Sequence, residues 1–191
     1  MATTNKNRTL IVNMVYAAVL TALVVILQFM GSFIRLGPFS ISLVLIPIVI
    51  GAAMCNQWIG AWLGFVFGMV VLISGDAAAF LAINIPGTII TVLLKGTACG
   101  LVAGLVYKLF AKFNKYVAVV IAAIVCPVVK TGVFLLGCST FFLDTLRVWA
   151  GGGNVLVYMI VFLVGGNFLV ELAINIVLSP VIVRLLNIRK K

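Results

Sequence analysis

Two lysines lie well inside long apolar segments, where an ionisable side chain is costly and usually has a function. Lys95 is about seven residues from the start of the segment 88–110, and Lys130 is about seven residues from the end of the segment 116–136. At about 1.5 Å per helical residue, both lie roughly 10 Å inside one edge of the apolar layer. The two cations repel each other unless an anion lies between them, which predicts a shared site for a carboxylate or phosphate. Alternatively, each lysine extends separately to the interface.

A polar stripe follows one face of the last apolar segment. Asn167, Glu171 and Asn175 are spaced by four residues, so they project from the same side of a helix. Such a stripe must face protein or a cavity rather than lipid. Asn167 reaches the depth of the two lysines and is a candidate ligand contact. For Glu171 we favour a structural or coupling role, as the partner of one lysine, over direct contact with a ligand.

Three further residues in the predicted outer loops are candidate contacts for the same ligand. Asn84 lies in the loop 74–87, and Trp149 lies in the glycine-rich loop 137–154, which has the composition of a flexible lid. Arg35, beside a Gly-Pro break, offers a third positive charge, although an arginine at a membrane interface is equally ordinary.

Several classes of chemistry lack the residues that they need. The chain has no histidine, and its four cysteines show no CxxC spacing, so we expect no metal site and no cofactor. It also has no phosphate-binding loop and no serine–histidine pair, so we expect neither catalytic residues nor nucleotide binding. Any transport must therefore be driven by another subunit or by a gradient.

The composition indicates that these polar residues are positioned by membrane-spanning helices. Hydrophobic residues make up 65% of the 191 residues, charged residues only 8%, and the mean hydropathy is +1.37. A spanning helix needs about 20 apolar residues, so the chain has room for about six spans and for no soluble domain. We expect one membrane domain over residues 1–191.

The apolar segments predict an all-α integral membrane protein with a six-helix transmembrane bundle. The expected spans are residues 10–33, 39–54, 58–73, 88–110, 116–136 and 155–186. The second and third are short and nearly continuous, so they are either tilted or cross the bilayer only partly.

The basic residues predict that both termini are cytoplasmic. With six spans, nine of the 13 lysines and arginines fall on one side: Lys6, Arg8, Lys108, Lys112, Lys115, Arg184, Arg189, Lys190 and Lys191. The net charge of +10 is thus a topology signal, and we expect no nucleic-acid partner.

Small residues at every fourth position predict close helix packing. Two glycine series occupy one face each of the third and fourth spans: Gly60, Gly64, Gly68 and Gly96, Gly100, Gly104. Ala18 and Ala22 form a similar face on the first span. That face either packs internally or docks another membrane subunit.

The chain resembles the substrate-binding S component of energy-coupling factor (ECF) vitamin transporters. The resemblance rests on LGPFSISLVLIPIVIGAAMCNQWIGAWLGFVFG from Leu36 to Gly68 and on IPGTIITVLLKGTACGLVAGLVYK from Ile85 to Lys108. It extends over nearly the whole chain in size, number of spans and basic termini. It implies a multi-pass protein of the cell membrane, surrounded by lipid.

The resemblance also implies partners and roles. Alanines separated by three residues dock the S component on a transmembrane coupling subunit, and this pattern matches Ala18 and Ala22. Two separate cytoplasmic ATPases hydrolyse ATP, and the S component topples in the bilayer to carry its vitamin inward. The last three spans and the outer loops hold the vitamin, and these spans include Lys95, Lys130 and Asn167.

The substrate and the energy source have alternatives. The sequence is most similar to pantothenate-type S components, and a carboxylate suits two lysines. A riboflavin-type member would use aromatic and amide contacts, which Trp149, Tyr158 and Asn167 offer. A stand-alone carrier would instead bind its coupling proton on Glu171.

An intramembrane enzyme that uses Asp76 and Asp144 is disfavoured. Both residues lie in loops, and nothing else in the sequence supports catalysis.

Overall fold

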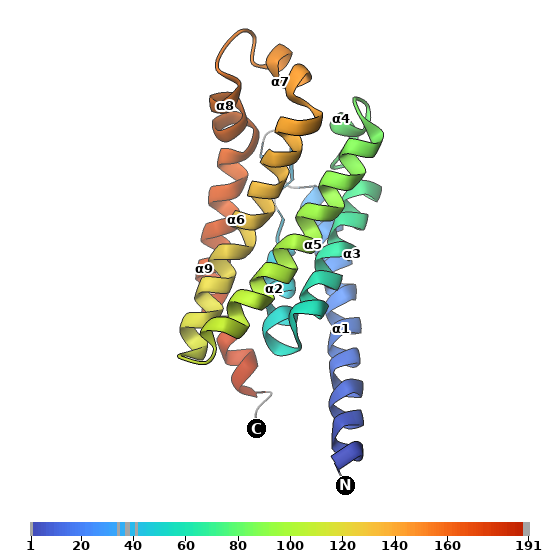
Figure 1. The fold of residues 1–191 in the computed structure, drawn as a ribbon, viewed down its shortest axis with the longest axis vertical. Helices are drawn as coiled ribbons and strands as arrows, with labels where there is room; N and C mark the ends of the chain where they lie inside the picture. The colour runs from blue at the N-terminus through green and yellow to red at the C-terminus, as the bar shows by residue number, and fades with distance from the viewer. Residues whose placement is uncertain (1, 34, 37–38, 41, 189–191) are drawn as a thin grey trace.

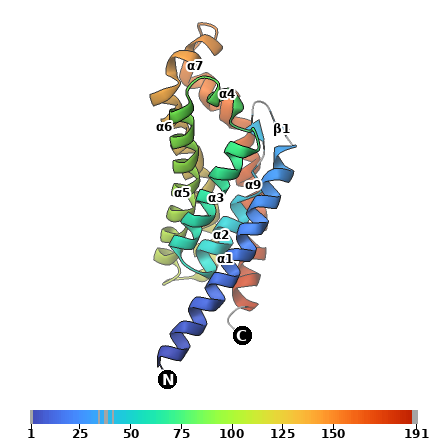
Figure 2. The same ribbon diagram turned by 90° about the vertical axis from the view of Figure 1, so that its right-hand side faces the viewer.

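In a computed structural model, the described residues 2–33, 35–36, 39–40 and 42–188 form an elongated bundle of helices (Figure 1). Most of the long helices run roughly along the long axis, and a second view shows α1 on the outside of the bundle (Figure 2). The long helices are α1 (Ala2–Ser32), α3 (Gln57–Ile73), α5 (Ile85–Phe110), α6 (Lys115–Phe141) and α9 (Gly166–Ile188).

Among the described residues, four helical segments are long and apolar enough to cross a membrane. They are Leu10–Ser32, Ile85–Phe110, Lys115–Phe141 and Val155–Asn187. Two further apolar helices, Leu45–Met54 and Gln57–Ile73, are shorter. The prediction of a helical protein with apolar helices long enough to span a membrane is confirmed.

The second expected span, residues 39–54, is only partly helical. A short antiparallel pair, β1 (Arg35–Leu36) with β2 (Phe39–Ser40), precedes α2 (Leu45–Met54). The expectation of a span beginning at residue 39 is wrong, because hydropathy cannot show that the polar groups of this stretch have partners far away in the sequence. Ser40 and Ser42 bind carboxylates from other parts of the bundle.

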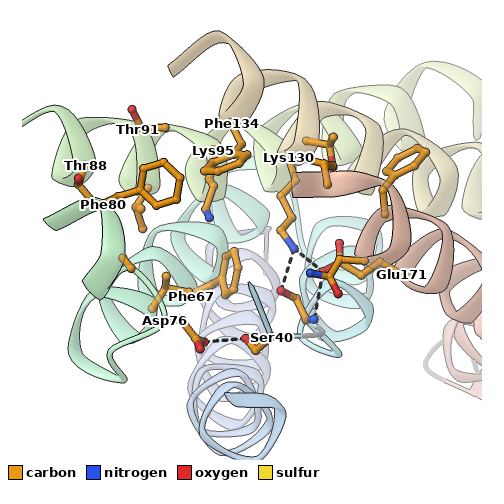
Figure 3. A pocket seen from close by; sticks show the side chains of 18 of the residues that line it. Ser40, Phe67, Asp76, Phe80, Thr88, Thr91, Lys95, Lys130, Phe134 and Glu171 are labelled. Carbon is orange, nitrogen blue, oxygen red and sulfur yellow. Dashed lines mark hydrogen bonds and ion pairs between the residues drawn. The ribbon is translucent and has the colours of Figure 1, made fainter. Parts of the chain in front are cut away.

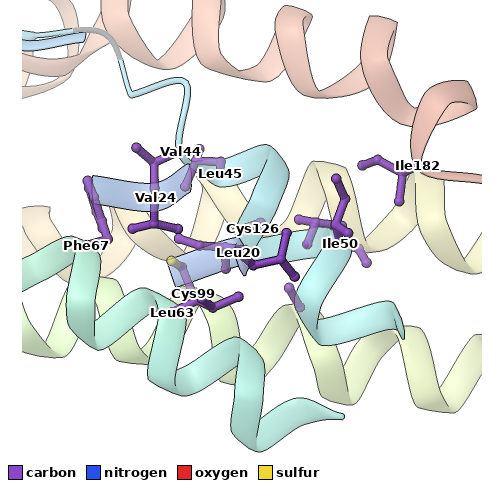
Figure 4. Packing of buried hydrophobic residues seen from close by; sticks show 14 of the residues in the cluster. Leu20, Val24, Val44, Leu45, Ile50, Leu63, Phe67, Cys99, Cys126 and Ile182 are labelled. Atoms are coloured by element: carbon purple, nitrogen blue, oxygen red, sulfur yellow. The ribbon is translucent and has the colours of Figure 1, made fainter. Parts of the chain in front are cut away.

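The short helix α2 lies at the centre of the apolar core. It contacts α1, α3, α5, α6 and α9, and Leu45, Ile48 and Val49 are fully buried. Figure 4 shows side chains of α1, α2, α3 and α9 converging around it. A helix enclosed by neighbours on so many sides is apolar all round, which explains why its sequence looks like that of a lipid-exposed span.

The two glycine series face each other between α3 and α5, as predicted. A Cβ added at Gly64 would overlap the carbonyl oxygen of Gly96, and one at Gly100 would overlap that of Gly60. Only glycine permits this backbone approach, so the series sets the spacing of the two helices.

The segments that were predicted to be outer loops are more helical than expected. Residues 137–154 contain the end of α6 and a further helix, α7 (Leu143–Trp149), and α4 (Ala78–Leu81) lies between α3 and α5. The last span, expected as one helix, consists of α8 (Val155–Val157), a π-helix η1 (Tyr158–Gly165) and α9. The π-helix is notable because such wide turns often occur at functional sites.

The termini of the described chain and the short helices α4 and α7 lie at opposite ends of the bundle. The start of α1, the end of α9 and the connection between α5 and α6 lie at one end, whereas α4 and α7 lie at the other (Figure 1). The basic residues Lys108, Lys112 and Lys115 therefore share an end with both ends of the described chain.

Candidate functional site

A polar pocket lies inside the bundle, and residues of α1, α3, α5, α6, η1 and α9 line it together with β2 and α4. Its volume is about 70 Å³, enough for a few water molecules. Its wall includes five phenylalanines, Phe67, Phe80, Phe134, Phe142 and Phe168. Two lysines and two carboxylates lie in the same wall, and each lysine lies near one of these rings.

Lys130, on α6, is neutralised by an acid from α9. Its Nζ lies 2.5 Å from Oε1 of Glu171 and donates a hydrogen bond of 2.7 Å to Oγ of Ser42. The backbone N–H of Ser42 donates to the same oxygen of Glu171 at 3.0 Å. This network, visible in Figure 3, ties the extended segment before α2 to α6 and α9.

Lys95, on α5, lines the same pocket but has no such partner. Only 9% of it is exposed, and within the described part of the chain it makes no hydrogen bond and no ion pair. Its Nζ lies 4.9 Å from the centroid of the Phe134 ring, a cation–π contact that compensates a buried charge only partly. The side chain points into the pocket (Figure 3).

The second carboxylate, Asp76, holds three elements together. Its Oδ2 accepts hydrogen bonds of 2.7 Å from Nε2 of Gln28 and from Oγ of Ser40, and one of 3.4 Å from Oγ of Ser74. The contacts join α1 and β2 to the loop after α3. Each carboxylate thus fixes one serine of the segment that precedes α2, Asp76 through Ser40 and Glu171 through Ser42.

The predicted polar stripe on α9 faces the protein interior. Asn167, Glu171 and Asn175 are all buried, and Asn167 and Glu171 line the pocket. Asn175 does not line it. Its Nδ2 donates to the backbone oxygen of Glu171 at 2.8 Å.

Two of the predicted ligand contacts lie elsewhere. Asn84 caps α5, because its side chain accepts a hydrogen bond from the N–H of Gly87 at 2.9 Å, and it does not line the pocket. Trp149 ends α7, where its ring lies 5.9 Å from that of Phe80, outside the lining. Loop composition alone could not reveal that Asn84 caps a helix or that Trp149 packs on Phe80. Arg35 belongs to β1, but its side chain lies outside the described residues.

Sequence reasoning missed most of the pocket lining, including the residues that form its second hydrogen-bond network. Gln28, Ser40 and Ser42 were not singled out, and Asp76 was considered only for catalysis. A signal existed for Gln28, since it and Asn13 are the two amides in the first span, residues 10–33. The serines had no such signal, because their partners are distant in sequence.

The small-residue face of α1 is open. Ala18 and Ala22 are exposed, although α1 packs against α3 through a bond of 3.3 Å from Nε1 of Trp62 to Oγ1 of Thr21. Within the described chain, internal packing therefore does not cover this face.

Apolar helices long enough to cross a bilayer, together with a pocket that holds two lysines and two carboxylates, are typical of a membrane protein that binds a small solute. The profile of the substrate-specific component of ECF transporters matches residues 12–183, and the chain belongs to this family. It is thus a multi-pass protein of the cell membrane, in a family that binds small substrates and works with membrane and ATPase subunits. Neither the comparison with curated proteins nor that with solved structures gives a match.

Proposed function

We propose that this chain captures a small anionic vitamin such as pantothenate on the outer side of the membrane. A transmembrane coupling subunit and two cytoplasmic ATPases then drive its delivery inward. One observation carries the proposal. Lys95 places an ammonium group in the pocket, and no carboxylate of the described residues forms an ion pair with it. A buried cation of this kind favours an anionic ligand, which would supply the missing hydrogen bonds.

The two lysines have different roles in this proposal. Glu171 already neutralises Lys130, so the ligand does not have to bridge both lysines. The ligand's anionic group lies on Lys95, and Lys130 holds the wall of the pocket through Ser42. Asn167 is a further contact. Asp76 and Glu171 repel a second negative charge, which favours a monoanion over a dianion.

The phenylalanines of the pocket favour a second candidate, riboflavin. Five aromatic rings suit a flat ring system, and Lys95 would then donate to a carbonyl oxygen of the ligand. The two candidates differ in how they depend on Lys95, because only a carboxylate forms an ion pair with it.

A stand-alone carrier with Glu171 as its proton site is a weaker proposal. Glu171 holds Lys130 and the backbone of Ser42, so protonating it would disrupt the wall of the pocket. Proton-dependent uptake by the purified chain alone in vesicles would favour this alternative.

The topology that fits capture has six spans in one membrane domain, with both termini cytoplasmic. The α4 and α7 end then faces outward, and the basic α5–α6 connection faces the cytoplasm, in line with the positive-inside rule. The exposed face of Ala18 and Ala22 is the docking surface for the coupling subunit, since small residues allow close helix contact.

The volume of the pocket implies that it widens when a ligand binds. Pockets for molecules of vitamin size usually enclose about 300–1,000 Å³, well above the 70 Å³ found here. Ser40 and Ser42 are the positions that we expect to move, because hydrogen bonds to Asp76 and Glu171 hold them rather than a continuous helix.

Mass spectrometry of small molecules released from the purified protein tests the proposal. We expect a carboxylate of vitamin size from the wild type and at least tenfold less from Lys95→Met. Lys112→Met, at the opposite end of the bundle, is the control and should retain the ligand. Release of riboflavin would favour the second candidate, and the absence of both a released molecule and pantothenate binding would contradict capture.

A further inference from the structure

Gln28, on α1, is a buried amide at the pocket. The residue is 1% exposed and lines the pocket. Its Nε2 donates to Asp76 at 2.7 Å, whereas its Oε1 is buried and has no hydrogen-bond partner among the described residues. The nitrogen of this amide therefore has a hydrogen-bond partner, whereas its oxygen has none among the described residues.

Asp76 fixes the orientation of that amide. An ionised carboxylate only accepts hydrogen bonds, and Oδ2 of Asp76 also accepts from the hydroxyl groups of Ser40 and Ser74. A flipped amide would place two acceptors against each other. The nitrogen of Gln28 must therefore face Asp76, and its oxygen is left as a buried acceptor without a donor among the described residues.

A buried acceptor without a donor is unfavourable, so such groups usually have a partner. We infer that Gln28 is a specificity residue that accepts a hydrogen bond from an O–H or N–H group of the substrate. The inference rests on the proposed function and narrows its substrate class. The ligand is a monocarboxylate whose anionic group binds Lys95 and whose hydroxyl or amide group binds Gln28.

Titrations in detergent test this assignment with pantothenate and two analogues. In one analogue the hydroxyl groups are O-methylated, and in the other the amide is N-methylated. We expect the wild type to bind one of the analogues about tenfold more weakly than pantothenate, the usual effect of one hydrogen bond. Gln28→Met should bind pantothenate about tenfold more weakly than the wild type and should lose discrimination against that analogue.

Ser74→Ala is the matched control. It removes a hydrogen bond from Asp76, but Ser74 does not line the pocket. This variant should discriminate between the ligands as the wild type does. If Gln28→Met keeps the discrimination of the wild type against both analogues, or if Ser74→Ala loses it as well, the assignment is overturned.

Molecules released from the purified protein separate this inference from the proposed function. A released carboxylate with a hydroxyl or N–H group, at least tenfold depleted in Gln28→Met but retained in Ser74→Ala, supports the assignment even when pantothenate does not bind. A released carboxylate without such a group overturns the role of Gln28 and leaves the capture function intact. A protein that releases nothing and does not bind pantothenate contradicts both.

Discussion

Lys130 and Glu171, 41 residues apart in the sequence, form a buried ion pair with 2.5 Å between Nζ and Oε1. The pair joins α6 to α9, and through Ser42 it also holds the segment before α2. Its consequence for function concerns Lys95. With Lys130 already neutralised, Lys95 is the cation of the pocket that an anionic ligand would pair with.

Removing one member of the Lys130–Glu171 pair should destabilise the protein. Glu171→Leu leaves an uncompensated buried charge, which typically costs about 3–5 kcal/mol. The double variant Lys130→Met, Glu171→Leu should recover much of this loss, because neither charge remains. Thermal unfolding in detergent measures both effects.

An exposed pair provides the control for that experiment. Asp144 and Arg147 lie 3.2 Å apart on α7 with exposed side chains, so Asp144→Asn should change the unfolding temperature little. A double variant no more stable than Glu171→Leu would contradict the role of the ion pair.

Close packing of α3 on α5 predicts that Gly64 does not tolerate a methyl group. In Gly64→Ala the new Cβ overlaps the carbonyl oxygen of Gly96, so the helices must separate and the unfolding temperature should fall strongly. Gly132→Ala on α6 is the control, since nothing lies within 4 Å of its added Cβ. It should be neutral or stabilising by up to about 1 kcal/mol, as expected for alanine replacing glycine in a helix. Equal stability of the two variants would refute the close contact.

The docking surface is tested by a bulky residue on α1. Ala18→Trp or Ala22→Trp should abolish co-purification with the coupling subunit, because the indole ring prevents close helix contact, and should leave ligand binding unchanged. Val177→Trp on α9, where valine is 72% exposed, is the control and should retain the complex. Complexes that survive both alanine substitutions would show that the coupling subunit docks elsewhere.

The sequence was sufficient to predict the long apolar helices and the matching depth of the two lysines, which both line one pocket, but not the short helices α4 and α7. The regular rise of a helix converts the position of Lys95 and of Lys130 within its segment into a depth, and the two depths match. The close approach of α3 and α5 was predictable for a similar reason, since glycines four residues apart share a face.

The parts that could not be predicted depend on contacts between distant residues. Hydropathy treats residues 39–54 as one span, whereas the structure has a strand at Phe39–Ser40 and a helix only from Leu45, and Ser40 and Ser42 bind Asp76 and Glu171. The choice of Lys130 over Lys95 as the partner of Glu171 is also a tertiary property. No local pattern in the sequence distinguishes the two lysines.

The most direct test of the account is the affinity of the purified protein for pantothenate before and after Lys95→Met. A hydrogen bond to a charged group contributes about 1.5–3 kcal/mol, so the dissociation constant should rise roughly 10- to 150-fold, while Lys112→Met should bind as the wild type does. Wild-type binding that is unchanged in Lys95→Met would contradict the central claim that this lysine holds the anionic group of the substrate.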